Sequence, residues 1–224
     1  MKKIILAAIA TVFFAGNAFA ERYVMVTHGE GKDPFWPVVE KAGADAAAQM
    51  GVDFEYIFNP SGDLADMASS IQAAAATQPD GMVVSLPDPD SLGNAIRAAT
   101  ASGIPVITIN SGLEAYKEVG ALMHIGQPET LAGQKAGERA AAEGATKALC
   151  MTPEQYNTAL SDRCNGYGEN VEIVSSVDTT HDAATIVTRA TAALQANPDV
   201  NAILSVSPTS VSYTHLTLPT IYSV

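Results

Sequence analysis

The sequence is poor in positive charge. Its 224 residues include 12 lysines and arginines against 24 aspartates and glutamates, which gives a formal net charge of −12 at pH 7. Nucleic acids and anionic membranes attract proteins that carry an excess of basic residues. The composition therefore argues against nucleic acid or a membrane surface as a partner, and a solvated acidic surface is the ordinary meaning of such a balance.

Long hydrophobic runs are also scarce, and none is comparable to the one at the N-terminus. A Lys-Lys start precedes the apolar run 4–14, and residues 18–20 (Ala-Phe-Ala) fit the small-x-small cleavage rule. The run is too short for a transmembrane helix, which needs about 20 apolar residues. The pattern predicts a signal peptide over residues 1–20 and export to the periplasm. Cleavage removes two of the 12 basic residues and leaves 10 against 24 acidic ones, a formal charge of −14.

Catalytic and metal-binding motifs are absent. The segment 29–34 approaches two phosphate-binding motifs, but proline replaces the last glycine of one, and Asp33 replaces the serine or threonine of the other. His28, His124 and His181 show neither HExxH nor Cys/His spacing, and no G-x-S-x-G elbow occurs. We therefore expect no enzyme activity, no cofactor and no metal.

The chain has only two cysteines, Cys150 and Cys164. In an exported protein they can form a disulfide, and a loop of about 15 residues closed in this way is worth about 3 kcal/mol. The alternative is two buried thiols that do not meet, because sequence does not show whether their Cα atoms approach within about 7 Å.

Apolar runs and segments of helical period alternate along the chain. In the second expected helix, for example, Leu64, Met67, Ala68 and Ile71 fall at i, i+3, i+4 and i+7. The first series consists of strands at 22–27, 52–58, 81–86 and 104–109, separated by helices at about 35–50, 63–78 and 90–102. Such an alternation predicts an α/β fold with a doubly wound parallel sheet.

A second series follows, with strands at about 121–125, 147–151, 171–177 and 202–206 and helices at about 128–143, 159–168 and 182–195. We therefore predict two similar doubly wound lobes, over residues 21–125 and 126–207, of which the second is incomplete. Residues 208–224 contain no alanine, glycine or charge and show no helical period. This segment reads as a non-native tail on a truncated second lobe.

Candidate binding groups collect where strands end and helices begin, which is where open parallel sheets bind ligands. The first expected strand leads to Asp33, Phe35 and Trp36, the only tryptophan, and the fourth ends at Asn110 and Ser111. Aromatic rings beside carboxylates and amides suit a sugar or polyol, whose C–H faces stack and whose hydroxyls form hydrogen bonds.

Each of these groups also has a purely structural interpretation. Asp33 and Asp88 precede helices and are suited to capping them. Phe35 and Trp36 are placed where aromatic residues cover a sheet edge, and a lone arginine such as Arg163 most often forms a surface ion pair.

The order of five segments carries a resemblance: 33–36 (DPFW), 81–85 (GMVVS), 103–110 (GIPVITIN), 124–127 (HIGQ) and 162–167 (DRCNGY). Together they resemble the periplasmic sugar-binding proteins of ABC importers, of the ribose/galactose (type I) family. The resemblance implies a monomer that closes two lobes on a sugar and then docks on a membrane permease. A sensor subunit for a chemoreceptor or histidine kinase is the alternative, and a lac-repressor-type regulator or an exported enzyme is less favoured.

The same resemblance implies the ligand residues. The rings of Phe35 and Trp36 would sandwich the sugar beside Asp33, and Arg163 would bond its ring oxygen or hydroxyls. Asn110 and Ser111 replace the Asp-Arg pair of ribose-type members, which removes a charged clamp. Further candidates for the ligand set are His28, Asp88 and Gln127.

Overall fold

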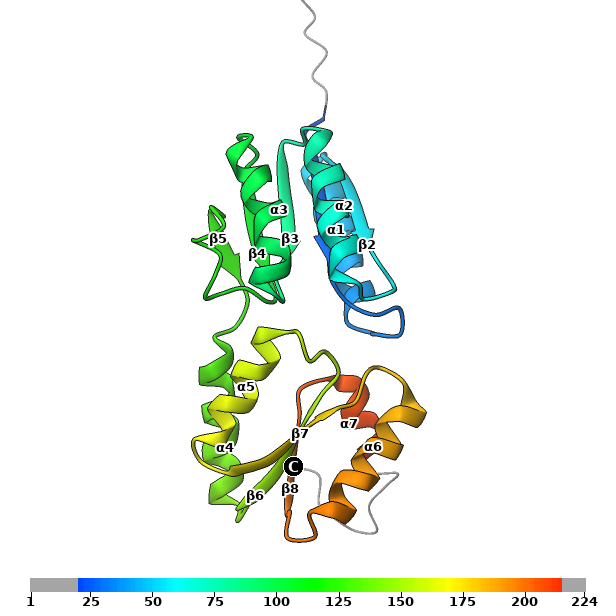
Figure 1. Cartoon of the computed structure of the whole chain (residues 1–224). Coiled ribbons are helices and arrows are strands. Elements are labelled where there is room, and N and C mark those ends of the chain that lie inside the picture. Colours follow the sequence, from blue (N-terminus) through cyan, green and yellow to red (C-terminus); the bar gives the residue numbers. More distant parts are fainter. Residues whose placement is uncertain (1–19, 215–224) are drawn as a thin grey trace, which may run out of the picture.

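The structure is a computed structural model that describes residues 20–214. The rest of the predicted signal peptide and residues 215–224 of the predicted tail lie outside the described part. Two α/β lobes are stacked one on the other, and the segment between β5 and α4 joins them (Figure 1). Within residues 20–214, no helix has the length and apolarity needed to span a bilayer.

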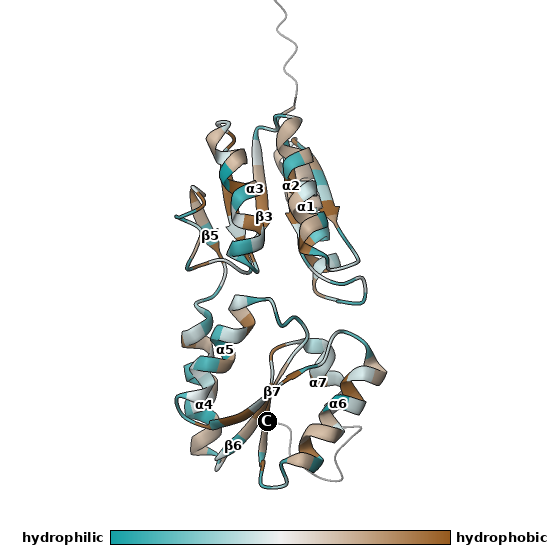
Figure 2. Cartoon of the chain, in the orientation of Figure 1, coloured by the Kyte–Doolittle hydropathy of each residue, from teal (hydrophilic) through white to brown (hydrophobic). Residues whose placement is uncertain are grey.

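The N-terminal lobe is built on a five-stranded parallel sheet of order β2-β1-β3-β4-β5. Its strands are β1 (Arg22–Thr27), β2 (Asp53–Phe58), β3 (Gly81–Ser85), β4 (Val106–Ile109) and β5 (Met123–Ile125), and its helices are α1 (Trp36–Met50), α2 (Leu64–Ala76) and α3 (Pro89–Ala101). The strands are its most hydrophobic parts (Figure 2), and Val24, Val84 and Val106 are fully buried beneath the helices.

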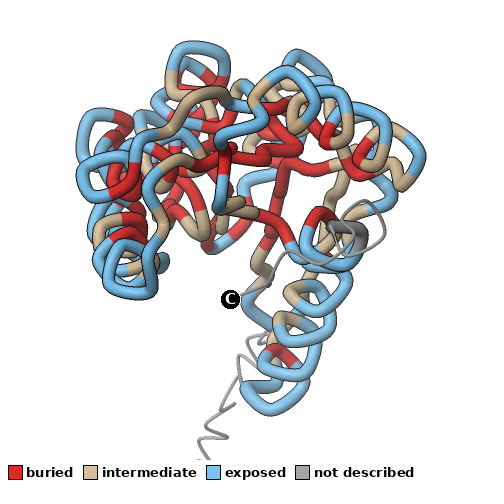
Figure 3. The backbone as a smooth tube through the Cα atoms, turned by 90° about the horizontal axis from the view of Figure 1, so that it is seen from below, coloured by how far each residue is buried: buried red, intermediate tan, exposed pale blue. Residues whose placement is uncertain are grey.

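The C-terminal lobe contains a three-stranded parallel sheet of order β7-β6-β8. Its elements are β6 (Lys147–Thr152), β7 (Glu172–Asp178), β8 (Ala202–Ser205), α4 (Glu129–Ala142), α5 (Thr158–Gly168), α6 (Ala183–Ala196) and α7 (Pro208–Thr214). The α/β class and the two parallel-sheet lobes are therefore confirmed. Buried stretches gather in the interior, whereas the outer helices are largely exposed (Figure 3).

Polar side chains fix the starts of four helices. The side chains of Asp63, Asp88, Asn157 and Asp182 accept hydrogen bonds from backbone N–H groups in the first turns of α2, α3, α5 and α6. These N–H groups have no partner within the helix, so an oxygen at this position satisfies them. The caps anchor each helix at the carboxyl end of the preceding strand, which is the edge where the lobes meet.

The segment after β8 differs from the sequence expectation. Although residues 208–214 show no helical period, they form the short helix α7. Ser210 is fully buried there, and its hydroxyl lies 3.0 Å from that of Thr179, which directly follows β7. Hydroxyl contacts of this kind, rather than an apolar stripe, hold α7 against the lobe. That residues 208–224 are non-native stays a prediction.

Helices α4 and α5 touch through their backbones. A Cβ placed on Gly166 would lie 2.1 Å from the carbonyl oxygen of Thr130, and one on Gly133 would lie 2.1 Å from that of Arg163. Any side chain would force the helices apart, so these positions require glycine. The contact sets the position of Arg163, which α5 carries toward the other lobe.

A disulfide joins Cys150 on β6 to Cys164 on α5, with the Cα atoms 6.0 Å apart. Both residues are buried beside Val206. The link resolves the alternative left open by the sequence, and loops of this length contribute about 3 kcal/mol. It ties α5 to the sheet from which the helix rises.

Direct hydrogen bonds connect the two lobes. The backbone N–H of Thr158 donates to the carbonyl oxygen of Pro87 at 2.9 Å, and the hydroxyl of Ser111 donates to Oδ1 of Asn157 at 3.1 Å. Lys32 and Asp182 add an exposed ion pair of 2.7 Å. The lobes are therefore in contact, and the strand ends of both face the same interface.

Candidate functional site

A cavity of about 690 Å³ lies between the lobes. This volume is typical of sites for small molecules. The N-terminal lobe and the connection after β5 contribute His28, Asp33, Phe35, Trp36, Asn110 and Gln127, and the C-terminal lobe contributes Glu129, Glu154, Asn157, Arg163, His181 and Ser207. Most of these residues follow the carboxyl end of a strand, so the fold itself brings them together.

One wall of the cavity is aromatic. Phe35 and Trp36 meet edge to face at 5.0 Å, and Trp36 meets His28 in the same way at 4.8 Å. Trp36 is only 2% exposed, because its ring lies where a Cβ on Gly29 would be, whereas Phe35 is 41% exposed. Two rings in mutual contact do not enclose a ligand from opposite sides. The two rings therefore form one apolar wall in this structure, and their enclosing a sugar stays a prediction.

His28 links the lobes at the back of the site. Its Nδ1 lies 2.7 Å from the hydroxyl of Ser85, at the end of β3. On the other side of the ring, Nε2 lies 3.2 Å from the side-chain nitrogen of Asn157 and 3.4 Å from a carboxylate oxygen of Glu154. This buried chain of contacts runs from one sheet to the other.

Asp33, Glu154 and His181 form a cluster in the cavity wall. Nε2 of His181 lies 3.9 Å from Asp33 and 3.8 Å from Glu154. Burial raises the pKa of Asp33 above its usual value. Burial alone would raise the pKa of Glu154 and lower that of His181, but the histidines and Asn157 hold the pKa of Glu154 well below its usual range, and the neighbouring carboxylates raise the pKa of His181.

Among the described residues that line the cavity, Arg163 is the only lysine or arginine. Its Nε donates to Glu129 at 2.6 Å, and its Nη1 donates to the carbonyl oxygen of Val206 at 3.2 Å. Gln127 donates to the same carboxylate of Glu129 at 2.9 Å. The guanidinium is thus held in a fixed orientation in the cavity.

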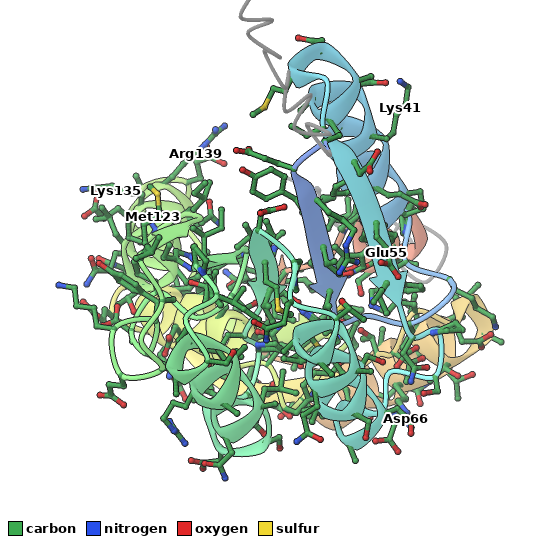
Figure 4. All side chains as sticks on the ribbon, turned by 90° about the horizontal axis from the view of Figure 1, so that it is seen from above. Lys41, Glu55, Asp66, Met123, Lys135 and Arg139 are labelled. Carbon is green, nitrogen blue, oxygen red and sulfur yellow. A yellow bond between two sulfur atoms is a disulfide. The ribbon has the colours of Figure 1, made fainter. Side chains whose placement is uncertain are left out.

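The other basic side chains on the surface do not reach the cavity. Lys41, Lys135 and Arg139 project from the periphery of the molecule (Figure 4), where each pairs with an acidic residue three or four positions further along the chain. The lining therefore contains three carboxylates, those of Asp33, Glu129 and Glu154, against one guanidinium.

Asn110 and Ser111 follow β4, as the sequence predicts, but they occupy different layers. Asn110 lines the cavity in a left-handed conformation with φ of 62°, which asparagine tolerates better than most residues. Ser111 is 1% exposed and lies behind it, where its hydroxyl donates to Asn110 and to Asn157. Ser111 therefore positions other residues rather than lining the cavity.

Asp88 is placed outside the cavity. Its Oδ1 accepts from the backbone N–H groups of Asp90 and Ser91, and its Oδ2 accepts from the hydroxyl of Ser91. Both oxygens thus take part in capping α3, and Asp88 is not brought together with the other candidate residues.

Sequence reasoning missed four charged or amide side chains of the site: Glu129, Glu154, Asn157 and His181. Glu154 and Asn157 follow β6, and His181 follows β7. Asp33 and Asn110 were identified because they follow the ends of strands. The same criterion could have identified Glu154, Asn157 and His181.

The chain matches a family model described as a periplasmic binding protein domain over residues 23–213. The chain belongs to this family. Members of the family are substrate-binding proteins rather than enzymes, and membership implies a periplasmic or extracellular location. No curated protein matches the sequence at a significant level.

Several solved structures of periplasmic binding proteins resemble this chain. A carbohydrate transporter from Acidothermus cellulolyticus 11B, in complex with myo-inositol, is 33% identical with a TM-score of 0.81, covering 88% of this chain and 71% of its own. A periplasmic sugar binding protein from Legionella pneumophila is 24% identical, with a TM-score of 0.79 and coverage of 88% and 74%. A solute binding protein from Burkholderia graminis C4D1M, in complex with D-arabinose, is 23% identical, with a TM-score of 0.78 and coverage of 91% and 72%.

Proposed function

We propose that this periplasmic binding protein captures a sugar or polyol between its lobes and delivers it to the permease of an ABC importer. The cavity is the observation that carries the proposal, because an apolar ring wall at Phe35 and Trp36 faces carboxylate, amide and imidazole groups of both lobes. The rings suit the C–H face of a polyol, and the polar groups suit its hydroxyls.

The relative that is 33% identical was solved with myo-inositol, so a cyclic polyol is the first ligand to test. Asp33, Glu154 and Glu129 accept hydrogen bonds, and Arg163 donates them. A ligand with hydroxyls around its ring meets both kinds of group.

Ligand contacts to both lobes would favour the closed arrangement, since only the closed form offers all of them at once. Asn110 on one side and Arg163 on the other lie on elements that belong to different lobes. The closed form is then the one that a permease recognises.

Isothermal titration with myo-inositol, D-arabinose, D-ribose and D-galactose tests the binding step, with a set of amino acids as the contrast. Asp33→Asn should weaken binding, whereas Asp88→Asn, which keeps its helix cap, should leave binding unchanged. Binding of amino acids but of no sugar or polyol would refute the proposal. Loss of uptake of the labelled ligand on gene deletion would support import, whereas uptake unchanged with a lost transcriptional or chemotactic response would favour a sensor.

A further inference from the structure

The cluster in the cavity wall has the composition of a metal site. We propose that Asp33, Glu154 and His181 bind one divalent transition-metal ion, of the zinc or manganese class, that bridges the two lobes. One ligand atom from each side chain lies within 4.8 Å of the other two. Asp33 belongs to the N-terminal lobe, and the other two belong to the C-terminal lobe. The inference does not depend on the identity of the sugar.

Neighbouring groups orient both carboxylates. Oδ1 of Asp33 accepts from the backbone N–H of Phe35 at 2.9 Å, and Oε2 of Glu154 accepts from the side chain of Asn157 at 2.8 Å. The remaining oxygens, Oδ2 and Oε1, face Nε2 of His181 at 3.9 and 3.8 Å. Hydrogen bonds of this kind orient the ligands in metal sites of known proteins.

His181 supplies the independent observation. The residue is 4% exposed, and its Nε2 is buried with no hydrogen-bond partner among residues 20–214. On the other side of the ring, Nδ1 lies 3.5 Å from the hydroxyl of Thr209. An imidazole that donates from Nδ1 presents the lone pair of Nε2, which is the form that binds metal ions.

The ligand set indicates the kind of ion. One imidazole nitrogen with two carboxylate oxygens suits zinc and manganese, whereas calcium and magnesium prefer oxygen ligands alone. Zinc bonds to such atoms measure about 2.0–2.2 Å, so the 3.8 and 3.9 Å separations fall within the span of two bonds. The two carboxylate oxygens that face Nε2 attract a cation: in the metal-free protein they favour a proton on this nitrogen, and a bound metal ion would take the place of that proton.

The test uses the purified protein made without a histidine tag, treated with EDTA and then dialysed. Titration with zinc chloride should show one ion bound per chain. His181→Gln and Glu154→Gln should each weaken zinc binding at least tenfold, because each removes one of three protein ligands. Manganese, followed by electron paramagnetic resonance, provides a second probe that reports the free ion directly.

His124→Gln is the matched control. Nε2 of His124 is also buried without a hydrogen-bond partner in the described part of the chain, but His124 belongs to no ligand cluster there. Circular dichroism confirms that each variant folds. Absence of bound zinc and manganese in the unmodified protein, or zinc binding retained in both variants, would overturn the inference. Titration with myo-inositol in EDTA tests the sugar proposal separately, so either proposal can fail alone.

Discussion

Nζ of Lys32 lies 2.7 Å from Oδ2 of Asp182, and the two residues belong to different lobes. The hydrogen bond from Lys32, together with bonds from the backbone and hydroxyl of Thr185, lowers the pKa of Asp182 to about 2. Both side chains of the pair are largely exposed. The pair therefore links the two lobes at the protein surface without burying charge.

Replacing Lys32 with methionine should favour the open form slightly. Because exposed ion pairs are weak and are screened by salt, we expect less than about a fivefold loss of ligand affinity at low ionic strength and none at 0.5 M salt. Lys41→Met is the control, since Lys41 pairs with Asp45 within α1. Equal effects of the two variants would show that only net charge matters.

Phe35→Ala should lower ligand affinity by about threefold to tenfold, the range expected for one aromatic contact. Because Phe35 is 41% exposed, the melting temperature of the variant protein should differ little from that of the unmodified protein. Val38→Ala is the control, because Val38 lies in the first turn of α1 just after Phe35, is 69% exposed and does not line the cavity. Calorimetric titration of both variants with myo-inositol measures the difference, and equal affinities would exclude Phe35 from the ligand contact.

Gly166→Ala should destabilise the C-terminal lobe by about 1–3 kcal/mol, the usual cost of overpacking. The added methyl group would meet the backbone of α4 at Thr130. Gly168→Ala in the same helix is the matched control, because its Cβ would make only an ordinary 3.5 Å contact with Ile173. Urea unfolding compares them, and a stable Gly166→Ala protein would contradict the close packing.

The stability of the protein should be greatest between about pH 4.5 and 6.5, measured with EDTA present. The pKa of Glu154 is lowered from 4.5, so its contribution is complete above that pH and is lost as the pH falls. The pKa of His181 is raised from 6.5, so its contribution is complete below that pH and is lost as the pH rises. The raised pKa of Asp33 acts against Glu154 on the acid side.

The melting temperature should therefore be highest between about pH 4.5 and 6.5 and should fall both below and above this range. His181→Gln should remove the alkaline slope and weaken the acid one, and Glu154→Gln should remove the acid slope and weaken the alkaline one, because each residue shifts the pKa of the other. A profile that neither variant changes would show that other groups control the pH dependence.

Local patterns predicted most of the fold. Helical period and capping residues such as Asp63 located α1 to α6 to within two residues at each end. Both signals depend on residues within about one helical turn of each other, so they can be read from the sequence. Helix α7 was missed because its contacts, such as that of Ser210 with Thr179, are tertiary.

The site was predicted less completely, for a related reason. Asp33 and Asn110 were recognised by their place after strands, but the contact of His28 with Asn157 joins residues 129 positions apart. Only the stacking of two lobes creates it. Likewise, no spacing rule reveals Asp33, Glu154 and His181 as neighbours.

The backbones of α4 and α5 are in direct contact, with no space for a side chain between them. A side chain at Gly133 or Gly166 would meet the backbone of the opposite helix, so both positions leave room for glycine alone. Glu129 on α4 and Arg163 on α5 line the cavity, so under the proposed function substitutions at these two residues would change the ligand contacts without disturbing the glycine contact between the helices. A redesign of ligand specificity would therefore vary Glu129 and Arg163 and keep Gly133 and Gly166 unchanged.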